Sequence, residues 1–182
     1  MAQFIPFDSK VQVNGQTILS VVNALHSGQE TRRIILEKNG IKDPKPGAWF
    51  PQSAWLKAFE EISKTIGSYT LFSIGKAIPE HATFPPEIDS LEKALSSIHV
   101  AYQMNHRGGE IGYYKLVWFD GPARKAMMEC KNPYPSEFDR GIITTMLRRF
   151  KPRDSFKYDV SLNLAFPTRL KGNDSCMFNI VW

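Results

Sequence analysis

The sequence predicts an α+β fold in which N-terminal helices pack on an antiparallel sheet of about four strands. Two observations predict this class. Residues 1–108 mostly show the apolar spacing of three and four residues that is typical of amphipathic helices. Residues 109–182 show aromatic or apolar segments, in part with period-two alternation, around one further helical segment, in a β-β-α-β-β order.

Composition and charge limit the class of protein. The chain has 182 residues, of which 42% are hydrophobic and 23% charged, and we expect one domain over residues 1–182. No apolar stretch reaches the ~20 residues that span a bilayer, and the N-terminus lacks a signal-peptide pattern. The net charge of +5 is spread along the chain, and the basic cluster at 148–153 suits a helix C-terminus. We therefore expect a cytoplasmic protein without a nucleic-acid partner.

The first half contains the expected helices. Apolar side chains recur at helical spacing over 18–25, 34–36, 55–62 and 69–78, with Asn39-Gly40 and Gly67 as stop signals. Residues 42–52 hold three prolines, so we expect a loop there.

That loop carries the pair Trp49-Phe50, which we expect to be buried and to pin the loop to the core. Asp89 and Glu92 are then spaced as a capping box, which predicts a helix from there to the residues before Gly108.

The second half contains the expected strands. Residues 111–119 and 123–130 flank the turn signal Asp120-Gly121-Pro122, which predicts a hairpin. A helix over 139–150 follows, with Asp139 as its expected cap. Residues 156–166 and 176–182 are expected to form the last two strands.

Two stretches of this half resemble a known family. "NPYPSEFDRGIITTMLRRF" is similar to the proline-containing turn, Arg-Gly pair and apolar helix of the 4-vinyl-reductase-type small-molecule-binding domain. "GNDSCMFNIVW" is similar to the closing Gly-x-x-x-Cys-x-Phe strand of that family. The superfamily includes haem-nitric-oxide-binding domains and TRAPP vesicle-tethering subunits, and the resemblance covers roughly residues 50–182. It implies a cavity between helices and sheet that binds a small apolar or aromatic molecule.

The markers of haem and zinc sites in that superfamily are incomplete. The haem branch carries Tyr-x-Ser-x-Arg, whereas Tyr134 and Ser136 are followed by Phe138 in the place of the arginine. His99 and His106 are possible axial ligands by residue type only.

Zinc-binding members use several cysteines, and this chain has only Cys130 and Cys176 as weak candidate ligands. Two thiolates do not complete a structural tetrahedral zinc site, and buried core thiols are the favoured interpretation. From these residues we expect neither haem nor zinc.

The segment "VAYQMNHRGGEIGYY" has two interpretations. Gly108-Gly109 suit a helix C-cap, and His106 and Arg107 suit the negative end of a helix dipole, so a simple helix end accounts for the segment. Alternatively, polar side chains gather here beside the expected cavity. The candidate ligand-binding residues are Tyr102, His106, Arg107, Glu110 and Tyr113, together with Arg140 at the start of a helix.

The function that we expect is a non-catalytic sensory domain that binds a small apolar or aromatic molecule and acts through a partner protein or a homodimer. A TRAPP-like interaction module without a ligand is the first alternative. A haem-based sensor, or an enzyme that uses His106 and Glu110, are further alternatives. Phosphate-binding loops, dinucleotide fingerprints and nucleophile elbows are absent from the sequence.

Overall fold

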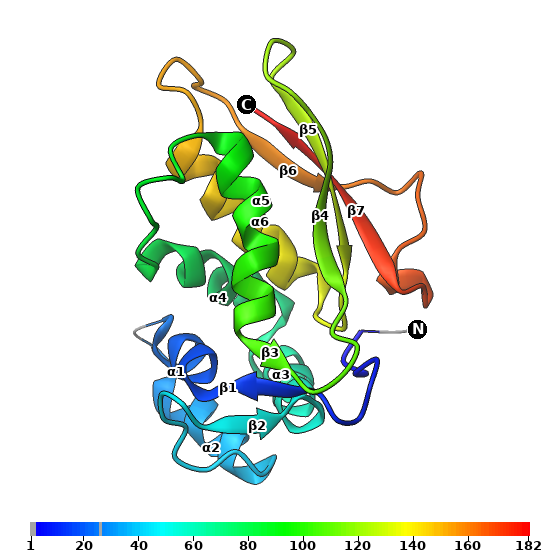
Figure 1. Cartoon of the computed structure of the whole chain (residues 1–182). Coiled ribbons are helices and arrows are strands. Elements are labelled where there is room, and N and C mark those ends of the chain that lie inside the picture. The colour runs from blue at the N-terminus through cyan, green and yellow to red at the C-terminus, as the bar shows by residue number, and fades with distance from the viewer. Residues whose placement is uncertain (1–2, 26) are drawn as a thin grey trace.

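A computed structural model describes residues 3–25 and 27–182 of the chain. A four-stranded antiparallel sheet forms one layer, and long helices cover one of its faces (Figure 1). A second, three-stranded sheet lies with the first helices at the other end of the molecule. The α+β class predicted from the sequence is confirmed.

The elements have the following bounds. The helices are α1 (Gly15–Asn23), α2 (Gln29–Lys38), α3 (Gln52–Ile66), α4 (Ser68–His81), α5 (Leu91–Met104) and α6 (Ser136–Phe150), and a 3-10 turn spans Arg169–Lys171. The strands are β1 (Gln12–Asn14), β2 (Trp49–Pro51), β3 (His106–Arg107), β4 (Tyr113–Asp120), β5 (Lys125–Lys131), β6 (Asp159–Leu162) and β7 (Ser175–Val181).

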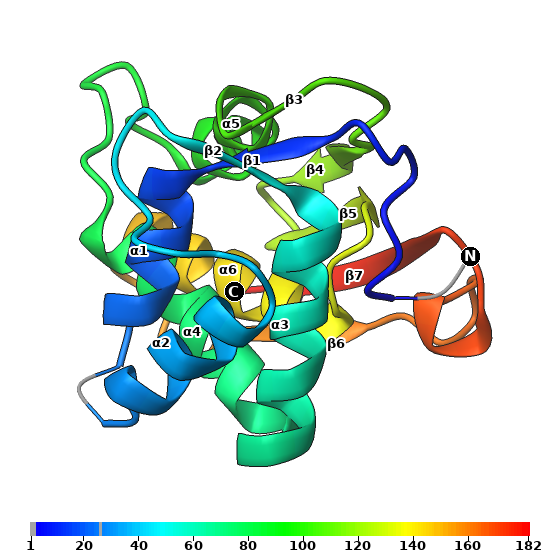
Figure 2. The same ribbon diagram turned by 90° about the horizontal axis from the view of Figure 1, so that it is seen from below.

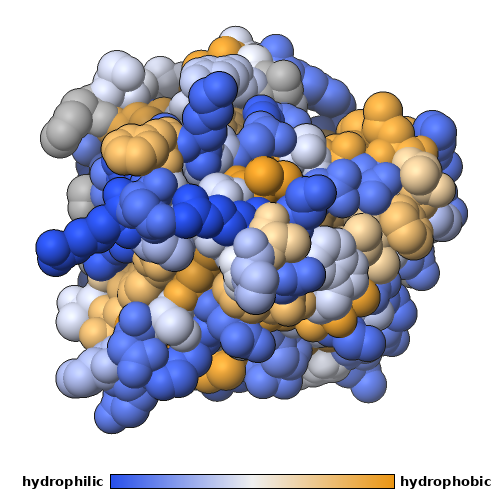
Figure 3. All heavy atoms as spheres, turned by 90° about the horizontal axis from the view of Figure 1, so that it is seen from above, coloured by the Kyte–Doolittle hydropathy of each residue, from blue (hydrophilic) through white to orange (hydrophobic). Residues whose placement is uncertain are grey.

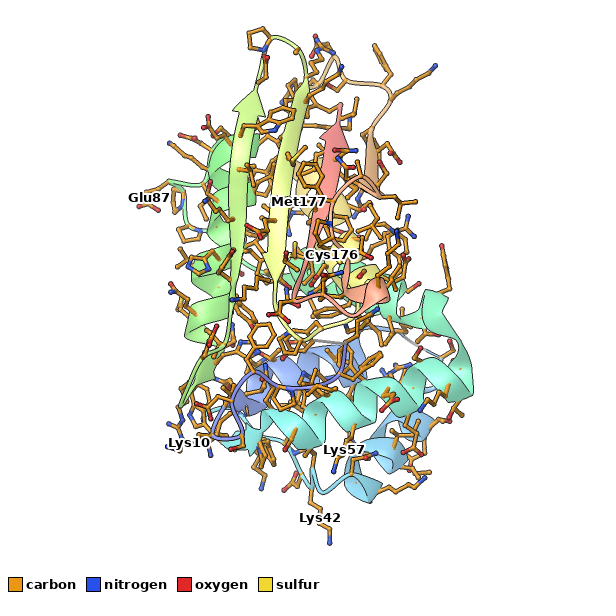
Figure 4. All side chains as sticks on the ribbon, turned by 90° about the vertical axis from the view of Figure 1, so that its right-hand side faces the viewer. Lys10, Lys42, Lys57, Glu87, Cys176 and Met177 are labelled. Carbon is orange, nitrogen blue, oxygen red and sulfur yellow. The ribbon has the colours of Figure 1, made fainter. Side chains whose placement is uncertain are left out.

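The larger sheet has the strand order β4-β5-β7-β6. Buried side chains alternate along β5 and β7, because neighbouring residues of a strand point to opposite faces. Cys176 is fully buried on the helix side, whereas its neighbour Met177 is only half-buried. Figure 4 shows the other face of this sheet, which no helix covers.

The smaller sheet was not predicted. Its order is β2-β1-β3, and Val13 of β1 is paired with Phe50 on one side and His106 on the other. Seen from below, β1 and β2 lie side by side next to α1 and α3 (Figure 2). Strands of two or three residues are too short for a period-two pattern, so only the tertiary pairing defines them. The expected loop at 42–52 therefore ends in a strand, and its Trp49 and Phe50 are half-buried.

Several element ends differ from the sequence prediction. Ser90, and not Asp89, caps α5, because its Oγ accepts a hydrogen bond from the main-chain N–H of Lys93 at 3.3 Å. The same helix ends at Met104, so Gly108, with φ of +95°, follows β3 and is no helix cap.

Helices α4 and α6 cross at two glycines. A Cβ atom on Gly141 would lie 2.3 Å from the carbonyl oxygen of Phe72 and 2.8 Å from the main-chain nitrogen of Lys76. A Cβ atom on Gly75 would lie 2.2 Å from the carbonyl oxygen of Phe138. The Arg-Gly motif of α6 thus serves close helix packing, because only glycine allows the two backbones to approach so closely.

Replacement of Gly141 by alanine is therefore expected to destabilise the protein by about 1–3 kcal/mol, the usual cost of overpacking, although alanine is the better helix former. Urea unfolding measures the change. Lys57→Ala, at an exposed position of α3 (Figure 4), is the control and is expected to change stability by less than about 0.5 kcal/mol. Equal stabilities of the two variants would contradict the close packing.

The surface shows no large apolar face on the side that Figure 3 presents. Hydrophobic residues there form separate patches among hydrophilic ones. In the basic cluster, Arg148 pairs with Glu80 at 2.7 Å and the Arg149 guanidinium lies over the ring of Phe84. None of the helices that the structure describes is of a length and hydrophobicity that could cross a bilayer.

Candidate functional site

A cavity of about 350 Å³ lies between the helices and the edge of the larger sheet. This volume is within the range of small-molecule sites. Its walls come from both halves of the chain and are mostly apolar or aromatic. The lining residues are Gln16, Thr17, Ser20, Trp55, Ile78, Pro79, Ala82, Phe84, Ser97, Ile98, Ala101, Tyr102, Asn105, His106, Tyr114, Tyr134, Phe138, Ile142 and Met146.

One face of α5 forms a wall of the cavity. Ile98 precedes Ala101 by three residues and Tyr102 by four, and the C-cap residue Asn105 follows them by four and three, so this spacing places all of them on one side of the helix. His99 is one residue from Ile98, does not line the cavity, and has a buried Nδ1 without a hydrogen-bond partner.

His106 lies directly after this helix and is only 7% exposed. Its Nδ1 is 2.8 Å from the carbonyl oxygen of Tyr102, and its Nε2 is 2.6 Å from the hydroxyl of Tyr134. A carbonyl oxygen can only accept, so Nδ1 carries the proton and Nε2 accepts from the tyrosine. Burial lowers the pKa of His106 to about 4. The imidazole is therefore neutral at physiological pH.

Two tyrosines, Tyr102 and Tyr134, contact this histidine, and a third, Tyr114, packs against Tyr102. The Tyr102 ring lies 4.2 Å from the His106 ring, 5.2 Å from Tyr114 and 6.3 Å from Tyr134, measured between centroids. Burial raises the pKa of all three phenols. Each tyrosine therefore keeps its proton and acts as a neutral hydrogen-bond donor.

A buried ion pair holds the Tyr114 side of the cavity. The Tyr114 hydroxyl donates to Asp139 Oδ1 at 2.6 Å, and Asp139 Oδ2 accepts from the Arg169 guanidinium. Arg169 also donates to the carbonyl oxygen of Asn132 at 2.7 Å. Asp139, the expected helix cap, is instead a fully buried partner of Arg169 inside the first turn of α6.

Of the six candidate ligand-binding residues, the structure brings Tyr102 and His106 together in the cavity. Arg107 is exposed, donates to Gln12 at 2.9 Å and lies over the ring of Trp49. Glu110 pairs with Lys131 at 3.5 Å on the surface. The enzyme hypothesis required Glu110 and His106 to lie together in one pocket. In the structure Glu110 is not among the residues that line the cavity.

Two further candidates also lie outside the cavity lining. The Tyr113 hydroxyl donates to Glu129 at 3.1 Å. Arg140 pairs with Glu137 at 2.6 Å and covers the ring of Phe72. For these residues and for Arg107 and Glu110, a ligand role stays a prediction.

The candidate metal ligands Cys130 and Cys176 occupy opposite positions on β5 and β7, and both are fully buried. The Cys176 sulfur is 3.2 Å from the Ser136 hydroxyl. Within residues 3–25 and 27–182, no three His, Cys, Asp or Glu side chains are grouped so that they could bind a metal ion together.

Two residues of the site were missed in the sequence. Tyr134 was set aside because the arginine of the Tyr-x-Ser-x-Arg motif is lacking, although the Tyr-x-Ser spacing itself marks the residue that contacts His106. Gln52, at the start of α3, had no signal beyond its place at a helix end, yet its side chain is fully buried against the tyrosines of the cavity.

Comparisons with known proteins give matches among solved structures. No family model and no curated protein matches the sequence. Cs H-NOX with an unnatural amino acid has a TM-score of 0.67 and 14% identity, over 92% of this chain and 95% of that chain. An oxygen-binding H-NOX domain related to soluble guanylate cyclases gives 0.64 and 14%, over 92% and 94%. The H-NOX from Shewanella woodyi, in its Fe(II)CO state, gives 0.56 and 17%, over 92% and 93%.

These comparisons correct two expectations. We ranked an apolar or aromatic ligand above haem, and this order is wrong. The structural neighbours are H-NOX domains, and one of them was solved to probe haem distortion. The argument against haem compared a short motif, in which Phe138 stands in the place of an arginine. Such a comparison of residues does not take the tertiary fold into account. The likeness is to the fold of H-NOX domains, and the 4-vinyl-reductase and TRAPP names are not confirmed. At this low identity the likeness concerns the fold: the chain folds as H-NOX domains do.

Proposed function

We propose that this chain is a haem-binding sensor domain that binds haem in its cavity with His106 as the axial ligand. One observation carries the proposal. His106 stands in the cavity wall with Nδ1 bound to the main-chain carbonyl of Tyr102. Most metal-ligating histidines are oriented by such a bond. Nε2 accepts from the Tyr134 hydroxyl at 2.6 Å in this structure, so Tyr134 would have to move away from Nε2 for the iron to bind there.

The residues that line the cavity suit the apolar ring of a haem, but they offer no cation for its carboxylates. Trp55, Phe138 and Met146 give apolar and aromatic walls for a flat ring. No lysine or arginine is among the lining residues that the structure describes. The carboxylates of a haem would therefore rely on neutral hydrogen-bonding groups such as those of Gln16 and Ser97.

When bound, the haem iron supplies a coordination position for a diatomic gas, as the neighbours described as oxygen-binding and CO-ligated suggest. Helices of residues 1–108 and α6 of residues 109–182 line one cavity, which supports a single domain over the chain. The output would pass to a partner protein or through a homodimer.

Titration of the haem-free protein with hemin tests the proposal. We expect a Soret band that saturates at one haem per chain, and His106→Ala is expected to lower the affinity by at least about tenfold. His99→Ala, in the preceding helix α5 and outside the cavity lining, is the matched control and is expected to bind as the unmodified protein does. Added imidazole is expected to restore the spectrum of His106→Gly.

Absence of saturable binding would overturn the proposal. Equal affinities of the His106→Ala and His99→Ala variants would refute His106 as the ligand while leaving haem binding in place.

A further inference from the structure

The cavity opens to solvent between α1, α5 and the segment that follows α4. Each of these segments contributes one exposed residue to the described lining, namely Gln16, Ala101 and Ala82. These three residues mark the mouth of the cavity. Tyr134 and Met146 also line the cavity but are buried, so they lie at its inner end. A ligand that fills the cavity therefore has one end among buried side chains and the other at the mouth.

The inner end has no hydroxyl proton to offer to a carboxylate. The Tyr114 hydroxyl donates to Asp139 at 2.6 Å. The Tyr134 hydroxyl donates to His106, and the Tyr102 hydroxyl donates to a main-chain carbonyl oxygen. Burial of a carboxylate without a donor or a cation is strongly unfavourable. A ligand with an apolar ring and carboxylates, such as haem, therefore places its carboxylates at the mouth.

A cation stands against the mouth without being part of the lining. Arg149, near the C-terminal end of α6, donates from Nη1 to the carbonyl oxygens of Pro79 and Ala82. Its guanidinium also lies over the ring of Phe84, 4.7 Å from the ring centroid. Pro79, Ala82 and Phe84 are all lining residues. Arg149 thus contacts three residues of the cavity wall on the side where the cavity opens.

Only one nitrogen of this guanidinium is engaged. The hydrogen bonds of Arg149 to the carbonyl oxygens of Pro79, Glu80 and Ala82 all come from Nη1. Within residues 3–25 and 27–182, no hydrogen bond uses its Nε or Nη2. An arginine can bind a carboxylate through two parallel hydrogen bonds from neighbouring nitrogens. Capping of the last carbonyls of α4 therefore accounts for Nη1 and leaves the other side of the guanidinium for a ligand.

We propose that Arg149 binds a carboxylate of the haem at the mouth of the cavity through Nε and Nη2. The carbonyls at the end of α4 and the rings of Phe84 and Phe150 hold the guanidinium in place, so the carboxylate meets a preorganised partner. The contact selects a tetrapyrrole with free carboxylates over the same ring with esters. This inference rests on the proposed binding of haem in the cavity, but it does not depend on the axial ligand.

Protoporphyrin IX tests the inference, because it has the carboxylates of haem but no iron. Fluorescence titration gives its affinity and that of its dimethyl ester. Arg149→Met is expected to lower the affinity for protoporphyrin IX by about tenfold and to leave the affinity for the ester unchanged. Arg149→Lys keeps the charge but cannot make two parallel hydrogen bonds, so an intermediate affinity is expected. Arg148→Met is the matched control and is expected to bind both porphyrins as the unmodified protein does, because Arg148 pairs with Glu80 on the surface.

The ester separates a ligand contact from a structural role. Unchanged binding of the ester shows that the cavity of a variant is intact. If Arg149→Met lowers the affinity for both porphyrins equally, Arg149 only supports the cavity wall and the inference is overturned. Equal affinities of the Arg149→Met and Arg148→Met variants for protoporphyrin IX also overturn it.

The outcomes also separate this inference from the proposed axial ligand. If hemin affinity depends on His106 but neither porphyrin nor hemin affinity depends on Arg149, the proposed function stands and the inference fails. If the ester-sensitive effect of Arg149 is found but His106→Ala binds hemin as the unmodified protein does, the inference stands and His106 is not the ligand. If the unmodified protein binds neither protoporphyrin IX nor hemin, both ideas fall together.

Discussion

Replacement of Arg169 by methionine is expected to destabilise the protein by about 3–5 kcal/mol, the usual cost when one partner of a buried ion pair is removed. The side chains of Arg169 and Asp139 are 1% and 0% exposed. Burial already raises the pKa of Asp139, and methionine removes the guanidinium that opposes this rise. The carboxyl group must then stay charged with Tyr114 and Asn132 as its donors, or take up a proton, and either outcome costs stability. The expected loss is a large part of the free energy of unfolding of a typical domain.

Chemical denaturation at pH 7 measures this loss. Lys171→Met, in the same 3-10 turn but exposed, is the matched control and is expected to change stability by less than about 0.5 kcal/mol. The double variant Arg169→Met/Asp139→Leu is expected to recover most of the stability, because apolar residues often replace a buried ion pair at little cost. Equal losses in the single and double variants would show that the pair is not the cause.

Stability of the haem-free protein is expected to fall by about 3 kcal/mol between pH 7 and pH 4 through His106 alone. Burial lowers the pKa of this histidine from 6.5 to about 4. Between these two values the unfolded chain binds a proton that the folded chain does not bind. Protonation therefore favours the unfolded state as the pH falls, and stability rises as the pH is raised from 4 to 6.5, above which the contribution of His106 is complete.

Urea unfolding across this pH range gives the profile. The His106→Gln variant is expected to differ from the unmodified protein in its free energy of unfolding at every pH. Its free energy of unfolding is also expected to change less between pH 6.5 and pH 4, because the contribution of His106 is missing. The comparison uses slopes because the substitution itself removes the hydrogen bonds to Tyr102 and Tyr134. Parallel profiles of the two proteins would contradict the lowered pKa.

The helices and the larger sheet could be predicted because local patterns encode them. Trp55, Leu56, Phe59 and Ile62 recur at helical spacing and form the buried face of α3. Residues 156–166 show period-two alternation in the sequence, and buried side chains alternate along β5 and β7 in the structure. The second sheet has no such signal, because β3 consists of two residues whose pairing with β1 joins segments far apart in the chain.

The candidate site was predicted only in part. Tyr102 and His106 were selected from a polar segment at a helix end, but the same segment supplied Arg107, Glu110 and Tyr113, which lie outside the cavity lining. Their residue types are equally suited to ligand binding. Which of them face the cavity depends on the strand pairing of β3 and on the direction of the turn that follows it.

The sequence by itself determined the α+β class and the order of the main elements. Only the tertiary structure decided that His106 is buried and neutral and that Tyr134 occupies its Nε2. The physical reason is that periodicity reports which side of an element is buried. Hydrogen bonds between residues 28 or more positions apart depend on how the elements pack together.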